Sequence, residues 1–169
     1  MRYLQTAVEH NVIREQGKLI VPSSSLNEFP LLWRWTDENY CLFLEAELEQ
    51  ITPLKADSAN AAWKKSIKFL DSSSESQLKS SLFRSVETIK VSNEEAVRAW
   101  LSEKMNNCKI TVSWSPDCAL TINTELFIKY WSDFCYPSSD EVTVWPENEA
   151  WVIHFSHFEI ISFGFTKSV

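Results

Sequence analysis

The 169-residue sequence contains only two glycines, Gly17 and Gly164. Loops that bind nucleotide phosphates need several glycines at fixed spacing, because only glycine allows the backbone to approach the phosphates so closely. The sequence therefore excludes both the dinucleotide-binding fingerprint and the Walker-type phosphate loop.

Histidine and cysteine are also scarce, and the cysteines show no Cys-x-x-Cys pairing. Free cysteine in a reducing compartment behaves as a small buried hydrophobe, so we expect neither a disulfide framework nor a thiolate metal site. The residues concerned are His10, His154, His157, Cys41, Cys108, Cys118 and Cys135.

The few groups that could act as metal ligands or nucleophiles are poorly placed. His154 and His157 lie three residues apart, and on a strand this offset puts their rings on opposite faces unless a bulge or turn lies between them. On a continuous strand His157 and Glu159 would share a face. Cys135 lies near the C-terminal end of an expected helix, where the helix dipole disfavours a thiolate. We predict no metal, no cofactor and no enzymatic activity.

Long apolar runs are absent as well. No stretch approaches the roughly 18 apolar residues that a membrane span requires. The segment Met1–Thr6 does not open an apolar signal-peptide region. The sequence predicts a protein without a membrane span, in the cytoplasm.

Basic residues are missing from two long stretches. The chain carries 16 Lys and Arg against 23 Asp and Glu, a formal net charge of −7. Residues 37 to 54 contain five acidic and no basic residues, and residues 130 to 166 contain six acidic and no basic residues. A protein that binds nucleic acid must neutralise phosphates, so we predict that this one does not. Each acidic block is either a solvated face or a surface that attracts a basic partner.

The chain is long enough for one domain with a substantial core, so we expect a single domain over residues 1–169. The expected fold class is α+β, with helices mainly in the N-terminal half packed on a mostly antiparallel sheet formed largely by the C-terminal half. Helices are expected at 2–16, 36–50, 58–70, 92–105 and 124–136, and strands at 18–21, 30–35, 86–91, 109–114, 120–122, 141–145, 150–156 and 159–165.

Side-chain patterns in the first half assign faces to these elements. Alternation puts Leu31, Trp33 and Trp35 on one face of the expected strand at 30–35. Thr36 is the expected N-cap of the following helix. Its apolar side would be formed by Leu42, Leu44 and Leu48.

Three later helices carry similar signals. Spacings of four and three indicate that Trp63, Ile67 and Leu70 form the buried face of the helix at 58–70. Ser92 and Glu95 have the spacing of a capping box. Thr124 would cap the last helix, which carries a broad aromatic stripe.

Two of the eight tryptophans are candidate interface residues. Trp145 and Trp151 flank the acidic turn 146–149. A partly exposed aromatic side chain beside carboxylates is typical of the centre and rim of a protein interface. The other tryptophans are expected in the core.

Two stretches resemble a family of small uncharacterised bacterial domains. The resemblance is carried by residues 31–35 through 51–54 to 62–63, and then by 127–140 and the strand residues up to Gly164. Some members of this family are similar to immunity proteins, which protect a bacterium from toxins delivered by contact. The resemblance implies a small cytoplasmic inhibitor, and it transfers no functional residue to this chain.

Together these observations predict an immunity-type protein that binds a cognate, basic bacterial toxin, such as a nuclease, and blocks its active site. The alternatives are a small-ligand or enzymatic domain with a pocket near the helix at 124–136, lined by Trp131 and Cys135, and a sugar-binding module with exposed tryptophans. The residues expected to bind the toxin are Asp37, Glu38, Asp140, Glu141, Trp145, Glu147, Glu149 and Trp151.

Overall fold

The computed structural model describes residues 26–167. The helix expected at 2–16 and the strand expected at 18–21 lie outside these residues. Within them the fold is α+β, with one large antiparallel sheet drawn mostly from the C-terminal half, as predicted.

Seven strands make up this sheet, and every neighbouring pair is antiparallel. In spatial order they are β1 (Thr52–Pro53), β6 (Cys118–Asn123), β5 (Lys109–Ser115), β7 (Val142–Pro146), β8 (Trp151–Ser156), β9 (Ile160–Thr166) and β4 (Phe83–Lys90). A separate two-stranded ribbon consists of β2 (Leu70–Asp71) and β3 (Ser74–Leu78).

Six α-helices and two 3-10 turns complete the described part of the chain. The helices are α1 (Trp33–Thr36), α2 (Glu45–Leu48), α3 (Ala56–Phe69), α4 (Glu94–Lys104), α5 (Thr124–Lys129) and α6 (Trp131–Phe134), and the 3-10 turns are η1 (Leu26–Glu28) and η2 (Ser80–Leu82). None of the helices between residues 26 and 167 has the length and apolar character needed to cross a membrane.

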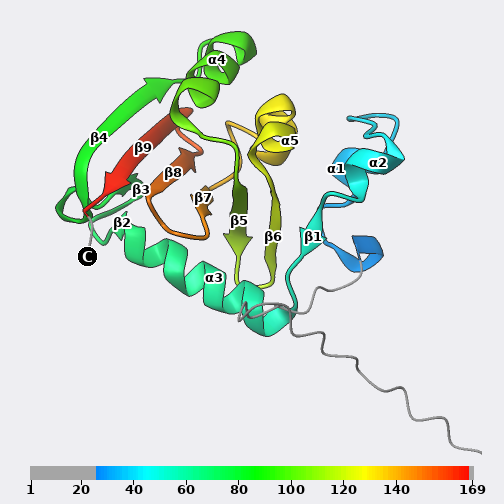
Figure 1. Cartoon of the computed structure of the whole chain (residues 1–169), viewed down its shortest axis with the longest axis horizontal. Coiled ribbons are helices and arrows are strands. Elements are labelled where there is room, and N and C mark those ends of the chain that lie inside the picture. Colours follow the sequence, from blue (N-terminus) through cyan, green and yellow to red (C-terminus); the bar gives the residue numbers. More distant parts are fainter. Residues whose placement is uncertain (1–25, 168–169) are drawn as a thin grey trace, which may run out of the picture.

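Helices cover both faces of the sheet (Figure 1). On one face α3 packs through Ala59, Ala62 and Phe69 against Ala119, Trp145 and Val152. On the other face α4, α5 and α6 pack against the larger core. The buried residues of that core include Val97, Leu101, Phe127, Trp131, Phe134, Ile110, Val112, Ile153 and Phe163.

The predicted strands of the second half are confirmed. The β5–β6 hairpin follows the alternation of apolar and polar residues, with Ile110 and Val112 buried. The three final strands lie within one or two residues of the expected ranges. Alternation fixes the buried face of β5, whereas β7 and β8 are buried on both faces and are delimited by the turns that flank them.

The predicted strand at 30–35 is wrong, because this segment forms a tight turn and then α1. Backbone N–H groups of Arg34 and Trp35 donate to carbonyls three residues earlier, at 3.0 Å. In a helical turn, residues two apart point to nearly opposite sides. Trp35 is therefore buried while Trp33 is exposed.

The predicted helix at 36–50 is also wrong, since after Thr36, the last residue of α1, only residues 45–48 are helical. The Asp37 carboxylate accepts hydrogen bonds from the backbone N–H of Asn39 at 2.9 Å and from its side chain at 2.8 Å. This side-chain turn competes with helix formation, so the chain leaves the helix at Asp37. The next helix, α2, begins at Glu45.

The helix expected at 58–70 is confirmed as α3, but its buried face differs. Ala59, Ala62, Ser66 and Phe69 face the sheet, whereas Ile67 is exposed. The expected set, Trp63, Ile67 and Leu70, and the observed buried set both recur at helical spacing. Small residues allow the helix to approach the strands closely, which selects the alanine face.

Two helix starts and one helix end differ from expectation. Asn93, rather than Ser92, caps α4 by accepting a hydrogen bond from the N–H of Ala96 at 2.8 Å. Thr124 is the first residue of α5, after an N-cap at Asn123. The backbone of Tyr130 (φ −121°, ψ 28°) breaks the expected aromatic helix into α5 and α6.

Candidate functional site

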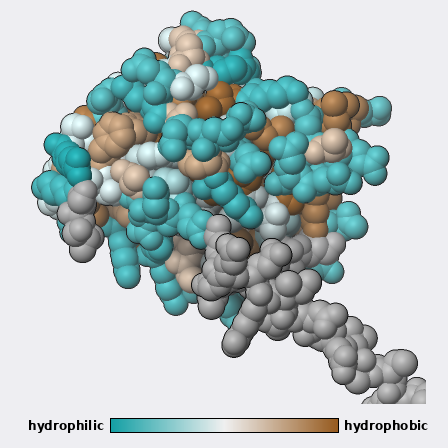
Figure 2. Space-filling model, in the orientation of Figure 1, coloured by the Kyte–Doolittle hydropathy of each residue, from teal (hydrophilic) through white to brown (hydrophobic). Residues whose placement is uncertain are grey.

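The segment around α1 and α2 exposes four large apolar side chains. Trp33 is 39% exposed, Tyr40 56%, Leu42 62% and Leu44 67%. The Trp33 and Tyr40 rings meet edge to face, with centroids 4.6 Å apart. In Figure 2, apolar brown atoms lie at the surface on the right-hand side, over α1 and α2, with hydrophilic teal atoms around them.

Phe43 explains why its two neighbours point outward. Its ring is buried and stacks on Tyr130 with centroids 4.1 Å apart. Its backbone N–H donates to the carbonyl of Trp35 at 3.0 Å. Because neighbouring side chains of an extended segment point to opposite sides, burying Phe43 leaves Leu42 and Leu44 in solvent.

Three carboxylates lie among these apolar side chains. Asp37, Glu38 and Glu45 form no ion pair with any residue between 26 and 167. The chain itself offers no Lys or Arg between residues 37 and 54. We call this set the α1–α2 surface: Trp33, Asp37, Glu38, Tyr40, Leu42, Leu44 and Glu45.

A buried ion pair lies directly beneath the α1–α2 surface. The Arg34 guanidinium donates two hydrogen bonds to Asp140, at 2.6 and 3.1 Å, and lies 4.0 Å from the centre of the Tyr136 ring. Asp140 also accepts the backbone N–H of Tyr136 at 3.0 Å. The Asp140 carboxylate is thus already satisfied within the fold, although the sequence suggested it as a contact to a partner.

A second charged group fixes the start of α2. The buried Glu47 carboxylate accepts hydrogen bonds from Lys129 at 2.6 Å, from the Tyr130 hydroxyl at 3.0 Å and from the N–H of Leu44 at 2.9 Å. The hydrogen bond from Lys129 is the main cause of a lowered pKa at Glu47, and it acts against burial. This carboxylate stays ionised while it orders α2.

The cysteines differ in burial, and none is an activated thiol. Cys118 and Cys135 are buried, as expected for small hydrophobes, while Cys41 and Cys108 are half-buried. Burial raises the pKa of Cys118 to about 12 and that of Cys135 well above its ordinary value. Burial and the neighbouring Asp133 raise the pKa of Cys41. A thiol must lose its proton to act as a nucleophile, so these groups are unreactive near neutral pH.

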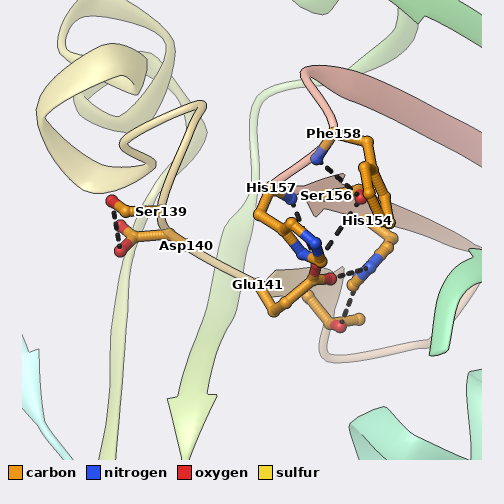
Figure 3. Close-up of polar contacts among 8 residues, drawn as sticks. Ser139, Asp140, Glu141, His154, Ser156, His157 and Phe158 are labelled. Atoms are coloured by element: carbon orange, nitrogen blue, oxygen red, sulfur yellow. Dashed lines mark hydrogen bonds and ion pairs between the residues drawn. The ribbon is translucent and has the colours of Figure 1, made fainter.

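Glu141 binds His154 of β8 and His157 in the turn after β8 (Figure 3). Its carboxylate contacts Nε2 of His154 at 2.8 Å, and also the ring and the backbone N–H of His157. The other ring nitrogen of His154 lies 3.0 Å from the Thr143 hydroxyl. A turn lies between the two histidines, because β8 ends at Ser156, and both rings therefore reach the same carboxylate.

The same turn separates His157 from Glu159, whose positive φ of 59° reverses the chain, so these two residues do not share a strand face. Burial would raise the pKa of Glu141, but the hydrogen bonds from His154 and His157 outweigh it and lower the pKa. Among the side chains that the structure describes, no three His, Cys, Asp or Glu are grouped so that they could hold a metal ion.

The acidic turn between β7 and β8 differs from the sequence interpretation. Trp145 and Trp151 are buried, at 4% and 3% exposure, so the expected partly exposed tryptophans are not found there. Trp145 packs edge to face on Phe69 beneath α3, and Trp151 stacks on Phe163 in the other core. Glu149 forms an exposed ion pair with Lys65.

The eight predicted contact residues therefore do not form one surface. Asp37 and Glu38 lie on the α1–α2 surface, with Asp140 beneath it. Glu141 faces away from Asp140 toward the histidines (Figure 3). Glu147 and Glu149 follow the opposite end of β7, beside the two buried tryptophans.

A shallow pocket of about 310 Å³ lies between the segment before β5 and the β7–β8 turn. Its lining residues are Asn106, Cys108, Lys109, Pro146, Glu147 and Asn148. The sequence placed a pocket near the aromatic helix, lined by Trp131 and Cys135, but both of these side chains are buried in the core. Neither of them lines this pocket.

Sequence reasoning missed the exposed apolar residues Tyr40, Leu42 and Leu44. The two leucines fit a helical stripe, which hid their exposure. The pair Asp37 and Asn39 was the available signal, because such side chains favour a turn over a helix.

Comparison with protein-family models, with curated proteins and with solved structures finds no match to this chain.

Proposed function

We propose that this protein is an immunity-type inhibitor that binds a basic protein toxin through the α1–α2 surface and blocks its active site. The observation that carries the proposal is the exposure of Trp33, Tyr40, Leu42 and Leu44 beside three carboxylates that have no counter-ion between residues 26 and 167. Exposed apolar groups with a charged rim are typical of protein interfaces.

The two kinds of residue have different roles in this proposal. Carboxylates attract a basic partner over a distance and mainly raise the association rate. Aromatic and aliphatic side chains lose water on contact and mainly slow dissociation. The surface thus combines fast capture with a long-lived complex, which an inhibitor of a toxic enzyme requires.

The partner follows from charge complementarity. A surface whose exposed charges are all negative repels nucleic acid and favours a protein rich in Lys and Arg. Nucleases carry such groups where they bind phosphates, so blocking that site would inhibit them. The proposal includes a cytoplasmic location, where the inhibitor would meet a toxin that has entered the cell.

The proposal is tested by co-expression with the product of the adjacent gene, scored by cell survival and by pull-down at low and high salt. Survival and a complex that weakens with salt are expected for the wild-type chain. Glu38→Lys with Glu45→Lys reverses the charge of the α1–α2 surface and should abolish the salt-sensitive complex.

The matched control is Glu147→Lys with Glu149→Lys, which makes the same charge change in the β7–β8 turn. This control should retain the complex. If the neighbouring protein is neither toxic nor bound by the wild-type chain, or if only the control loses binding, the proposal is wrong.

A further inference from the structure

We propose that Arg34 and Asp140 are positioning residues, whose buried ion pair holds Trp33 and Tyr40 in their exposed arrangement before a partner arrives. This inference rests on the proposed function of the α1–α2 surface. Its physical part, the ordering of residues 37–44, can be measured on the free protein.

Arg34 joins α1 to two points of a segment that lies 100 and 106 residues later in the sequence. It belongs to α1, it donates two hydrogen bonds to Asp140 before β7, and it lies 3.5 Å from the Phe134 carbonyl at the end of α6. The Asp140 and Arg34 side chains are 12% and 7% exposed. A planar guanidinium bound at both of its ends has one allowed orientation, which a lysine in its place would lack.

The pair reaches the exposed aromatic side chains through Tyr136. The Tyr136 ring lies under the guanidinium, and its backbone N–H donates to Asp140. The Trp33 ring contacts both Tyr136 and Tyr40, with ring centroids 6.3 and 4.6 Å apart. Fixing Arg34 therefore fixes one wall of the site that holds the Trp33 ring.

The composition of the pair favours a positioning role over a purely stabilising one. Removing two charges from water is costly, and well-packed apolar residues often stabilise a core equally well. The Nε of Arg34 is buried without a hydrogen-bond partner among the described residues, so the pair is not optimised for stability. The ion pair instead gives the exposed aromatic side chains a defined geometry, which lowers the conformational entropy lost when a partner binds.

The first test is hydrogen exchange on the free, full-length protein. The amides of Tyr40 and Phe43 report on the segment, because they donate to Asp37 and Trp35 carbonyls. In Arg34→Lys and Asp140→Asn we expect these amides to exchange at least about tenfold faster, while amides of β5 and β6 are unchanged. Arg34→Met, which keeps an apolar stem, should show the same local loss without global unfolding.

Thr143→Val is the matched control, since it removes a buried polar contact, the one to His154, outside this region. It should leave exchange at Tyr40 and Phe43 unchanged. Unchanged exchange in the Arg34 and Asp140 variants, or equal acceleration in the control, would overturn the inference.

The second test measures binding to the product of the adjacent gene. Arg34→Lys should raise the dissociation rate by about tenfold and leave the salt dependence of association unchanged, because the charge is kept. If the wild-type chain binds but Arg34→Lys dissociates at the wild-type rate, the positioning role is wrong and the proposed function stands. If exchange changes as expected but the wild-type chain binds nothing, the proposed function fails and only the ordering role survives.

Discussion

The α1–α2 surface and the β7–β8 turn are both acidic and both rich in aromatic residues, yet they use their aromatic side chains in opposite ways. The α1–α2 surface buries Phe43 and exposes Tyr40, Leu42 and Leu44 around it. The β7–β8 turn follows a strand whose Trp145 is covered by α3, and its carboxylate Glu149 is paired with Lys65.

This difference shows that a block of negative charge does not by itself identify an interface. The course of the backbone decides whether the neighbouring apolar residues face water or the core. An extended acidic segment that buries one residue, as this one buries Phe43, exposes the two neighbours of that residue. An acidic turn between two central strands does not.

The largest effect is expected for Trp145→Ala. Trp145 fills the space between Phe69 and the sheet, so its loss should lower the free energy of unfolding by about 3–5 kcal/mol. Urea unfolding measures this. Leu44→Ala is the control from the α1–α2 surface and should change stability by less than about 0.5 kcal/mol. Similar small effects at both positions would mean that Trp145 is not a core residue.

A loss of affinity is expected when the apolar part of the α1–α2 surface is made polar. Leu42→Ser with Leu44→Ser should weaken binding to the product of the adjacent gene by roughly 30-fold, the effect of losing a central contact worth about 2 kcal/mol. The free energy of unfolding should be almost unchanged. The measurement is a titration by surface plasmon resonance.

Phe158→Ser is the matched control for that pair, because Phe158 is 61% exposed in the turn between β8 and β9. It should bind as the wild-type chain does. A control that loses as much affinity as the double variant would remove the distinction between the two exposed apolar sites.

A smaller effect is expected from Glu141→Gln. The pKa of Glu141 is lowered in the folded protein by its hydrogen bonds, despite burial. Its ionised form therefore stabilises the fold above the unfolded pKa of about 4.3, and this contribution is lost as the pH falls through the lower folded pKa. The side chain is 37% exposed, so solvent screening reduces the contribution to the order of 1 kcal/mol.

Urea unfolding of the wild type and of Glu141→Gln, at neutral pH and at a series of acidic pH values, measures that contribution. The wild type should be more stable at neutral pH, and the difference should shrink in acid. A difference that stays constant down to the lowest pH would contradict the role given to the carboxylate.

The smallest effect is expected from neutralising the carboxylates of the α1–α2 surface. Glu38→Gln with Glu45→Gln should reduce the association rate constant about threefold at low salt and leave dissociation unchanged. Glu147→Gln with Glu149→Gln should change neither rate. Stopped-flow measurements at several salt concentrations separate the two pairs, and equal effects of both would mean that only total charge matters.

Regular patterns made much of the fold predictable from the sequence. The β5–β6 hairpin follows an alternation of apolar and polar residues, and α3 and α4 follow helical spacings. The last three strands are short segments separated by turn residues. Residues 30–50 could not be assigned correctly, because strand and helix patterns overlap there. A single local interaction, the Asp37 side chain with Asn39, decides the outcome.

The candidate site was only partly predictable. Asp37 and Glu38 were identified from charge, but Leu42 and Leu44 were assigned to a buried stripe. The exposure of Trp145 could not be judged, because it depends on α3, which packs on that strand from a distant part of the chain. Local sequence does not record which face of a central strand another element covers.

The most direct test of the central comparison is a hydrogen-exchange footprint of the complex with the product of the adjacent gene. We expect slower amide hydrogen exchange in residues 33–45 of the bound protein and no change in residues 146–149. Protection of residues 146–149 without protection of 33–45 would contradict it.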